Sequence, residues 1–192
     1  MNPLRWARAE LLHLAWKRGV YLPPDRELLE TILPVLGREP GVERVLSVGV
    51  AWYTQSYERL TAVRTFVTVD HDPARASFGV PGRHIIAELT DLESVIPESE
   101  PFDVIVMNGV IGFGLDTPED IERGLRACAA RLRPRGTLLL GMNLQLAPLS
   151  LTSIVSGGLF EPRAFGEWAD GRVTVEVPFR ERTHTFVFLR RR

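Results

Sequence analysis

The chain has 192 residues, of which 45% are hydrophobic and 24% are charged, a composition typical of a folded globular protein rather than a disordered one. The formal net charge is −1 and the only basic cluster is the terminal Arg190–Arg192, so nucleic acid is not an expected partner. The single cysteine excludes an intramolecular disulfide and a cysteine-built zinc site, and we expect no metal. No apolar run approaches the roughly 20 residues that span a bilayer, so we expect no membrane contact and a cytoplasmic location.

Two helices are predicted before the first strand. Apolar residues at helical spacing predict a helix over Leu4–Trp16, and Pro23 and Pro24 then break the chain. Asp25 is expected to cap a second helix that ends near Pro34. We interpret residues 1–40 as a helical cap over one edge of the site; plain packing against the sheet is the alternative.

A repeated strand–helix pattern follows. Continuous apolar runs, rather than alternating ones, predict parallel strands that are covered on both faces. The helix-compatible segments between them imply right-handed crossovers, and therefore an open sheet with helices on both faces. The predicted strands are Arg44–Val50, Thr65–Val69, His84–Ala87, Asp103–Met107 and Thr137–Gly141.

The clearest helix signals lie between Pro118 and Leu132. Thr117 is the expected N-cap, and Pro118 occupies the first helical position. Cys128 falls on the apolar stripe of this helix, and no neighbour in sequence would lower its pKa. We therefore predict a core cysteine rather than a nucleophile.

The end of the chain has a different pattern. Residues Arg172–Phe179 alternate between apolar and polar, and Thr185–Leu189 is a second β-rich run. The few residues between them cannot form a helical crossover, so the two runs must form an antiparallel hairpin. The sequence thus predicts one α/β domain over residues 1–192, with its core at 42–192. This domain is Rossmann-like, with a seven-stranded, mostly parallel sheet, helices on both faces and a C-terminal antiparallel hairpin.

The stretch FDVIVMNGVIGFGLDTPEDIERGLRACAARLRPRGTLLLG (Phe102–Gly141) resembles a run of elements in the class I S-adenosylmethionine (SAM) methyltransferases, of the type 11-like group. It is similar to their fourth strand, the following loop and helix, and the turn into the fifth strand. Order and lengths carry the resemblance, which extends over residues 42–143 and suits the closing hairpin. The resemblance implies SAM as the cofactor and methyl transfer as the activity.

The position of Asp70 fits this resemblance. It ends the second predicted strand, 21 residues after Gly49. In dinucleotide-type folds an acid about 20 residues beyond the glycine loop accepts the ribose hydroxyls, and a carboxylate has the lone pairs to do so. The resemblance implies that Asp70 binds the ribose of SAM. The alternative is a helix cap or turn residue before Pro73.

Three further positions follow from the resemblance. It places Asp91 near the adenine amino group, although this residue could equally cap the short helix after it. It places Asn108 and Gly109 beside the methyl-transfer site, where the amide would hold a substrate or the amino-acid end of SAM. The alternative for Asn108 is a left-handed turn.

The glycine loop departs from the family pattern. The family has an acid and three alternating glycines after the first strand, whereas Ser47, Ala51 and Tyr53 occupy the acid and two of the glycine positions here. Only Gly49 remains. The aromatic residues either line the pocket, where their faces would attract a sulfonium cation, or fill it and leave a binding or scaffold protein. The predicted cofactor-contacting loop comprises Gly49, Val50, Ala51, Trp52 and Tyr53.

Methyl transfer depends mainly on aligning donor and acceptor, and it needs a general base only when the acceptor must lose a proton. His71 and Asp116 are the candidate bases, and His84 is expected to be structural. Because the chain has no large appended domain, we expect a small-molecule acceptor. The sequence does not decide between a monomer and a homo-oligomer.

Two rival functions remain open. One is a catalytically inactive protein that keeps the methyltransferase fold as a binding or scaffold partner. The other is a nicotinamide-dependent oxidoreductase, because Asp70 would also suit the ribose of a nicotinamide cofactor. The oxidoreductase requires G-x-G-x-x-G, which Gly49–Thr54 does not supply.

Overall fold

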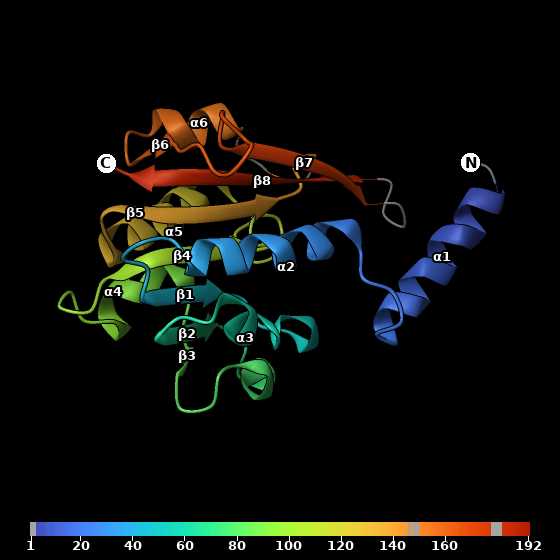
Figure 1. The fold of residues 1–192 in the computed structure, drawn as a ribbon, viewed down its shortest axis with the longest axis horizontal. Helices are drawn as coiled ribbons and strands as arrows, with labels where there is room; N and C mark the ends of the chain where they lie inside the picture. The colour runs from blue at the N-terminus through green and yellow to red at the C-terminus, as the bar shows by residue number, and fades with distance from the viewer. Residues whose placement is uncertain (1–2, 146, 148–149, 178–181) are drawn as a thin grey trace.

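The computed structural model describes residues 3–145, 147, 150–177 and 182–192. Its centre is a sheet in the order β3-β2-β1-β4-β5-β8-β6, in which the first five of these strands run parallel (Figure 1). This confirms the predicted α/β class. The parallel strands are β1 (Arg44–Val48), β2 (Thr65–Asp70), β3 (His84–Ile86), β4 (Phe102–Asn108) and β5 (Leu132–Met142).

The other end of the sheet is antiparallel. Strand β8 (Arg182–Arg191) pairs with β5 on one side, and with β7 (Arg172–Val177) and β6 (Phe160–Pro162) on the other. The pairing of β7 with β8 confirms the predicted hairpin; the expected strand end at Phe179 lies outside the described residues. Because the short β6 adds one strand, the sheet of the described residues has eight strands rather than seven.

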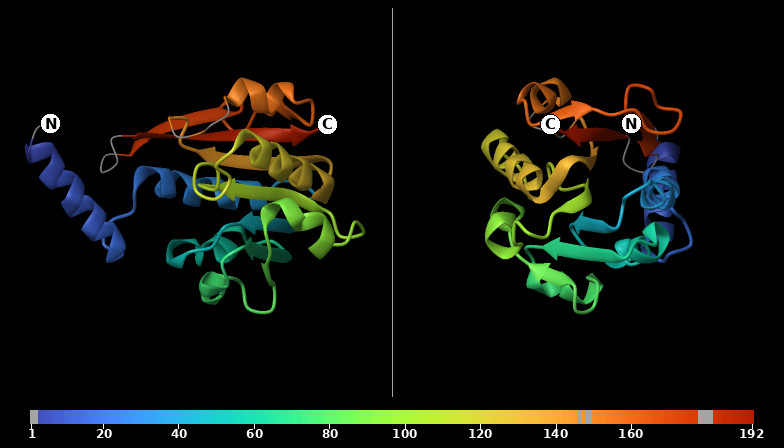
Figure 2. Two further views of the ribbon diagram at one scale, coloured as in Figure 1. Left: turned by 180° about the vertical axis from the view of Figure 1, so that it is seen from behind. Right: turned by 60° about the vertical axis from the view of Figure 1, so that its left-hand side comes forward.

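Helices cover both faces of the sheet (Figure 2). On one face α4 (Leu92–Val95), α5 (Pro118–Arg131) and α6 (Leu151–Ser156) pack over one apolar cluster. On the other face α2 (Pro24–Gly37) and α3 (Tyr57–Thr61) pack over a second cluster. Cys128 on α5 is fully buried, as predicted. Three short 3-10 segments complete the described elements: η1 (Trp52–Thr54), η2 (Pro73–Phe78) and η3 (Leu89–Asp91).

Both predicted bounds of α2 are wrong. The helix is capped by Pro23, with Pro24 inside its first turn, so Asp25 is a helical residue and its side chain is not the cap. The helix also continues through Pro34 to Gly37, because Leu36 is buried in the second cluster and that burial offsets the missing proline N–H.

Helix α1 (Pro3–Lys17) extends away from the sheet on the side where the parallel strands end (Figure 1). Its last turn touches the remainder of the chain through Trp16, whose ring lies 5.7 Å from that of Trp52 and 5.3 Å from that of Tyr53. In the described part of the chain, none of the helices combines the length and apolarity needed to cross a membrane.

Candidate functional site

A cleft opens at the carboxyl ends of β1, β2 and β4. Strand β1 lies between the other two, and the chain leaves it toward β2 and returns on its far side through β4. Such a switch point leaves a crevice at the strand ends, because the two connections diverge there. The residues that line this cleft include Gly49, Val50, Tyr53, Asp70, His71, Arg75, Glu88, Leu89, Asn108, Gly109 and Phe113.

The first wall of the cleft is the loop after β1. Gly49 has φ +82°, a left-handed conformation that favours glycine, and its N–H donates to the Val69 carbonyl at 2.8 Å. Ala51 has an extended backbone with φ −157°, and its N–H donates to Thr54 Oγ1 at 3.0 Å. The loop therefore needs glycine at Gly49 but not at Ala51.

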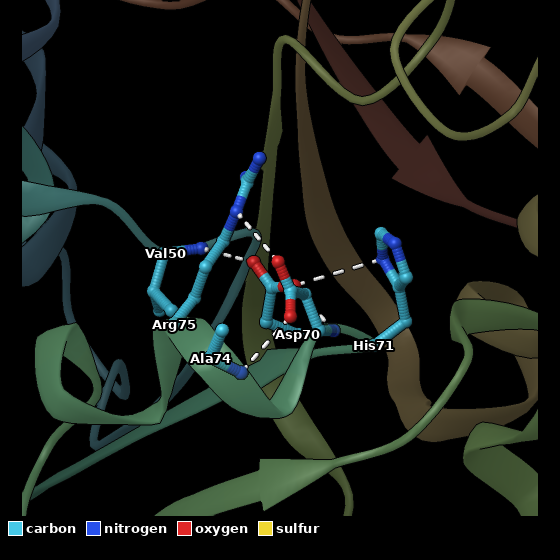
Figure 3. A network of polar contacts seen from close by, with 6 residues as sticks. Val50, Asp70, His71, Ala74 and Arg75 are labelled. Carbon is cyan, nitrogen blue, oxygen red and sulfur yellow. Dashed lines mark hydrogen bonds and ion pairs between the residues drawn. The ribbon is translucent and has the colours of Figure 1, made fainter.

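Asp70 joins this loop to β2. It is 5% exposed, and its Oδ2 accepts from the Val50 N–H at 2.8 Å (Figure 3). Its Oδ1 accepts from the Asp72 N–H at 2.9 Å. A carboxylate oxygen can accept a second bond, so each of these oxygens keeps acceptor capacity. The cap before Pro73 is Asp72, whose Oδ1 accepts from the Ala74 N–H at 2.9 Å. The helix-cap alternative for Asp70 is thus taken by Asp72, whereas the turn alternative is confirmed, because the bond from the Asp72 N–H to Asp70 Oδ1 is that of an Asx turn.

The aromatic residues of the loop divide into two groups. Tyr53 lines the cleft, whereas Trp52 is 40% exposed and stands outside its lining. The guanidinium of Arg26 lies over the Tyr53 ring, with its central carbon 4.5 Å from the ring centroid. Tyr53 therefore lines the cleft with its ring against a cation of the chain itself.

Asn108 and Gly109 end β4 at the back of the cleft. Asn108 Oδ1 lies 2.8 Å from His184 Nε2, while its buried Nδ2 has no hydrogen-bond partner among the described residues. A flip of the amide would exchange these two atoms, so one of them is unpartnered in either orientation. Gly109, with φ +70°, is the left-handed turn residue that the sequence suggested for Asn108.

The structure does not bring every predicted residue to the cleft. Asp91 and Asp116 are exposed and stand outside the lining, and so does Ala51. Glu88, three residues before Asp91, lines the cleft. His71 also lines it, and its Nδ1 lies 3.6 Å from Asp70 Oδ1.

His84 has the structural role expected of it. Its Nδ1 lies 3.0 Å from the Thr68 hydroxyl, which in turn accepts from the Val80 N–H. These bonds fix the start of β3 against β2. Among the described residues, no group of three or more His, Cys, Asp or Glu side chains is placed to hold a metal ion.

A second cavity adjoins the cleft, and sequence reasoning missed most of its residues. The two spaces share Tyr53, Arg75, Gly109 and Phe113, so they lie side by side. The second is also lined by Trp16, Pro23, Asp25, Arg26, Asn143, Val177 and His184. These residues come from the N-terminal segment, the end of β5 and strands β7 and β8, and no sequence pattern links such distant segments. The available signals were the helical cap expected over residues 1–40 and, within it, the charged pair Asp25–Arg26 directly after two prolines.

Arg26 is the most constrained charge in this cavity. It is 9% exposed, and its Nη1 donates to the Tyr57 hydroxyl at 3.2 Å. Burial alone would lower the pKa of Arg26, but Tyr57, Tyr53 and Asp25 together raise it above its usual value. Burial raises the pKa of the Tyr57 phenol, and Arg26 offsets only part of that shift. Arg26 is therefore a cation, and Tyr57 a neutral acceptor, at physiological pH.

A mostly parallel sheet in this order, with an antiparallel end and a cleft at the switch point, is the fold of the class I SAM-dependent methyltransferases. Solved structures confirm this similarity of fold. The N-methyltransferase NodS from Bradyrhizobium japonicum WM9, in complex with S-adenosylhomocysteine, is 15% identical with a TM-score of 0.65, over 97% of this chain and 98% of NodS.

Two other solved structures are also similar. The 1,6-didemethyltoxoflavin-N1-methyltransferase from Burkholderia thailandensis, with 1,6-didemethyltoxoflavin and S-adenosylhomocysteine bound, is 16% identical with a TM-score of 0.64, over 98% of this chain and 87% of that one. The [4+2]-cyclase SpnF is 12% identical with a TM-score of 0.60, over 86% and 80%. No protein-family model and no curated protein matches the sequence.

Proposed function

We propose that the protein is a SAM-dependent methyltransferase that acts on a small molecule. The observation that carries this proposal is the buried carboxylate of Asp70, which lines a cleft at the switch point of a methyltransferase-like sheet beside the left-handed Gly49. A carboxylate in this place is suited to two vicinal ribose hydroxyls.

The residues present fit SAM. Asp70 would hold the ribose, and Leu89 offers an apolar surface to the adenine. The unpartnered amide atom of Asn108 would gain a partner from a ligand in the cleft. When bound, SAM supplies an electrophilic methyl group on its sulfonium.

The chain's own task is to place an acceptor against that methyl group and exclude water. The second cavity is suited to this because it adjoins the cleft at Tyr53 and Gly109. Asn143 and His184 line it, and both are buried. His71 lines the cleft and remains a candidate base, whereas Asp91 and Asp116 would have to move to reach a ligand. The structure of the toxoflavin enzyme, which has the small molecule 1,6-didemethyltoxoflavin bound, supports a small-molecule acceptor by likeness of fold.

The second candidate function is a protein that keeps the fold without transferring methyl groups. One observation favours it: both oxygens of Asp70 already accept backbone hydrogen bonds, as a purely structural clamp would. The [4+2]-cyclase SpnF also indicates that this fold is not confined to methyl transfer.

Calorimetric titration with SAM and S-adenosylhomocysteine separates these functions. We expect micromolar binding of both ligands, and a loss of affinity of about 100-fold or more in Asp70→Ala, because two charge-assisted hydrogen bonds are removed. Asp103→Ala is the matched control. Asp103 Oδ2 accepts from the Glu43 and Arg44 N–H groups at 2.7 Å each, at the opposite end of the sheet. Folded wild-type protein that binds neither ligand would contradict the proposal.

A further inference from the structure

We propose that Asp25 and Arg26 bind the amino-acid end of SAM, Arg26 its carboxylate and Asp25 its ammonium group. This rests on the proposed function and assigns a part of the ligand that the reduced glycine loop does not account for. The loop lacks the acid and two of the three glycines expected there, and Ser47, at the acid position, is 3% exposed within β1.

The charges of the pair match the charges of the ligand. The amino-acid end of SAM is a zwitterion at neutral pH, so a complementary site needs a cation and an anion side by side. Arg26 Nε lies 3.6 Å from Asp25 Oδ2, and the two residues are 9% and 8% exposed. Both residues belong to the first turn of α2. The positive end of the helix dipole lies there and also favours the carboxylate of the ligand.

The pair is incompletely satisfied without a ligand. Asp25 Oδ1 is buried and has no hydrogen-bond partner among the described residues. A carboxylate oxygen left in this state is costly, and buried ion pairs that serve structure alone normally satisfy their remaining lone pairs. An ammonium group would supply the missing donor.

The guanidinium is held ready for a ligand. Tyr57 accepts a bond from its Nη1, and the Tyr53 ring lies against its face. A guanidinium fixed on two sides loses little further freedom on binding a carboxylate, and its planar fork suits bidentate contact. Tyr53, which stands at a family glycine position, thereby gains a function: it positions Arg26.

The pair also reaches the correct part of the cleft. A Cβ placed on Gly109 would lie 3.7 Å from Arg26 Nη2, so this nitrogen is close to the carboxyl end of β4. Gly109 and Tyr53 line both the cleft and the second cavity. A ligand with its ribose at Asp70 would extend past these two residues toward Asp25 and Arg26.

Two ligands test the assignment by calorimetry. S-adenosylhomocysteine has the amino-acid end, and 5′-methylthioadenosine has the same adenosine and sulfur without it. We expect Arg26→Gln and Asp25→Asn to weaken S-adenosylhomocysteine roughly tenfold or more, and to leave 5′-methylthioadenosine within about twofold. Arg26→Lys keeps the charge without the planar fork, so it should weaken S-adenosylhomocysteine by a smaller factor and serves if Arg26→Gln fails to fold.

Arg44→Gln is the matched control. Arg44 pairs with Glu100 at 2.9 Å and lies over the Phe102 ring at 5.3 Å, but at the opposite end of β1. It should leave both ligands unaffected. Equal weakening of both ligands by the Arg26 variants would overturn the proposal, since Arg26 would then act only through the loop. Unchanged affinity for S-adenosylhomocysteine would also overturn it, and wild-type protein that binds neither ligand would instead remove the proposed function itself.

Discussion

The cleft and the second cavity beside it form the two halves of the candidate site, and they are built in different ways. The strand-end half, formed by Gly49, Val50 and Asp70, depends on backbone conformation and backbone N–H groups. The helix half, formed by Arg26, Tyr53 and other side chains of the second cavity, depends on buried side chains from distant segments. A loop whose backbone is set by one glycine tolerates the loss of the others, because the remaining positions adopt ordinary conformations. The helix half does not tolerate substitution in this way, because its residues contact one another through their side chains.

The largest effect on stability is expected from Gly141→Ala, next to the helix half. A Cβ at Gly141 would lie 2.1 Å from Asn108 Oδ1 and 2.9 Å from His184 Nε2, so the bond between these two residues must break. We expect a loss of about 1–3 kcal/mol in the free energy of unfolding, measured in urea. Gly157→Ala, where the nearest atom lies 3.5 Å away, is the control and should be near neutral. Equal stability of the two variants would show that Asn108 moves aside freely.

Gly49→Ala probes the strand-end half, and here conformation rather than space is limiting. The nearest atom to a Cβ at Gly49 is 3.7 Å away, but φ is +82°. We expect a cost of about 1–2 kcal/mol, with S-adenosylhomocysteine and 5′-methylthioadenosine weakened together, because both require the adenosine side of the cleft. Gly82→Ala has similar strain at φ +73° in open space and should leave both affinities unchanged. Selective weakening of one ligand in Gly49→Ala would contradict this division of the candidate site.

A smaller effect is expected from Tyr53→Leu, which removes the ring under Arg26. A cation–π contact of this kind contributes about 0.5–2 kcal/mol, so S-adenosylhomocysteine affinity should fall between about twofold and thirtyfold. Tyr53→Phe keeps the ring and should bind almost as the wild type does. Trp52→Leu is the control from the same loop. If Phe and Leu at position 53 weaken binding equally, the Tyr53 hydroxyl rather than its ring is responsible.

Much of the strand-end half could be predicted from the sequence, and little of the helix half could. Asp70 was found because it ends an apolar run at a fixed distance from Gly49, and both are properties of one βαβ unit. Asp25 was misassigned as a cap because the sequence does not reveal that Pro23 takes that position. The role of His184 depends on its pairing with Asn108 across 76 residues, which only the sheet register determines.

The fold could be predicted from the sequence more fully than the site could, for a related reason. The parallel strands and α5 have local signals, such as Thr117, whose Oγ1 accepts from the Asp120 N–H at 3.1 Å. The end of α2 was missed because Pro34 is a local signal that burial of Leu36 overrides. Sequence patterns therefore succeed where local chemistry and tertiary packing agree, and fail where packing decides.

The smallest effect at neutral pH is expected from Cys128, which belongs to neither half of the candidate site. Burial raises its pKa from 9.0 to about 12, so the folded state keeps the proton while the unfolded state loses it above pH 9. The unfolded state then binds fewer protons, and the free energy of unfolding must fall as pH rises. This contribution is about 0.4 kcal/mol at pH 9 and approaches about 1.4 kcal/mol per pH unit up to pH 12. The stability of Cys128→Ala should therefore decline less steeply than that of the wild type over this range, although the Tyr57 phenol contributes to both profiles.

Saturating S-adenosylhomocysteine should leave the difference between the two slopes unchanged, because α5 packs Cys128 into the core and no ligand in the cleft reaches it. A difference that disappeared with ligand would mean that Cys128 senses the cleft after all.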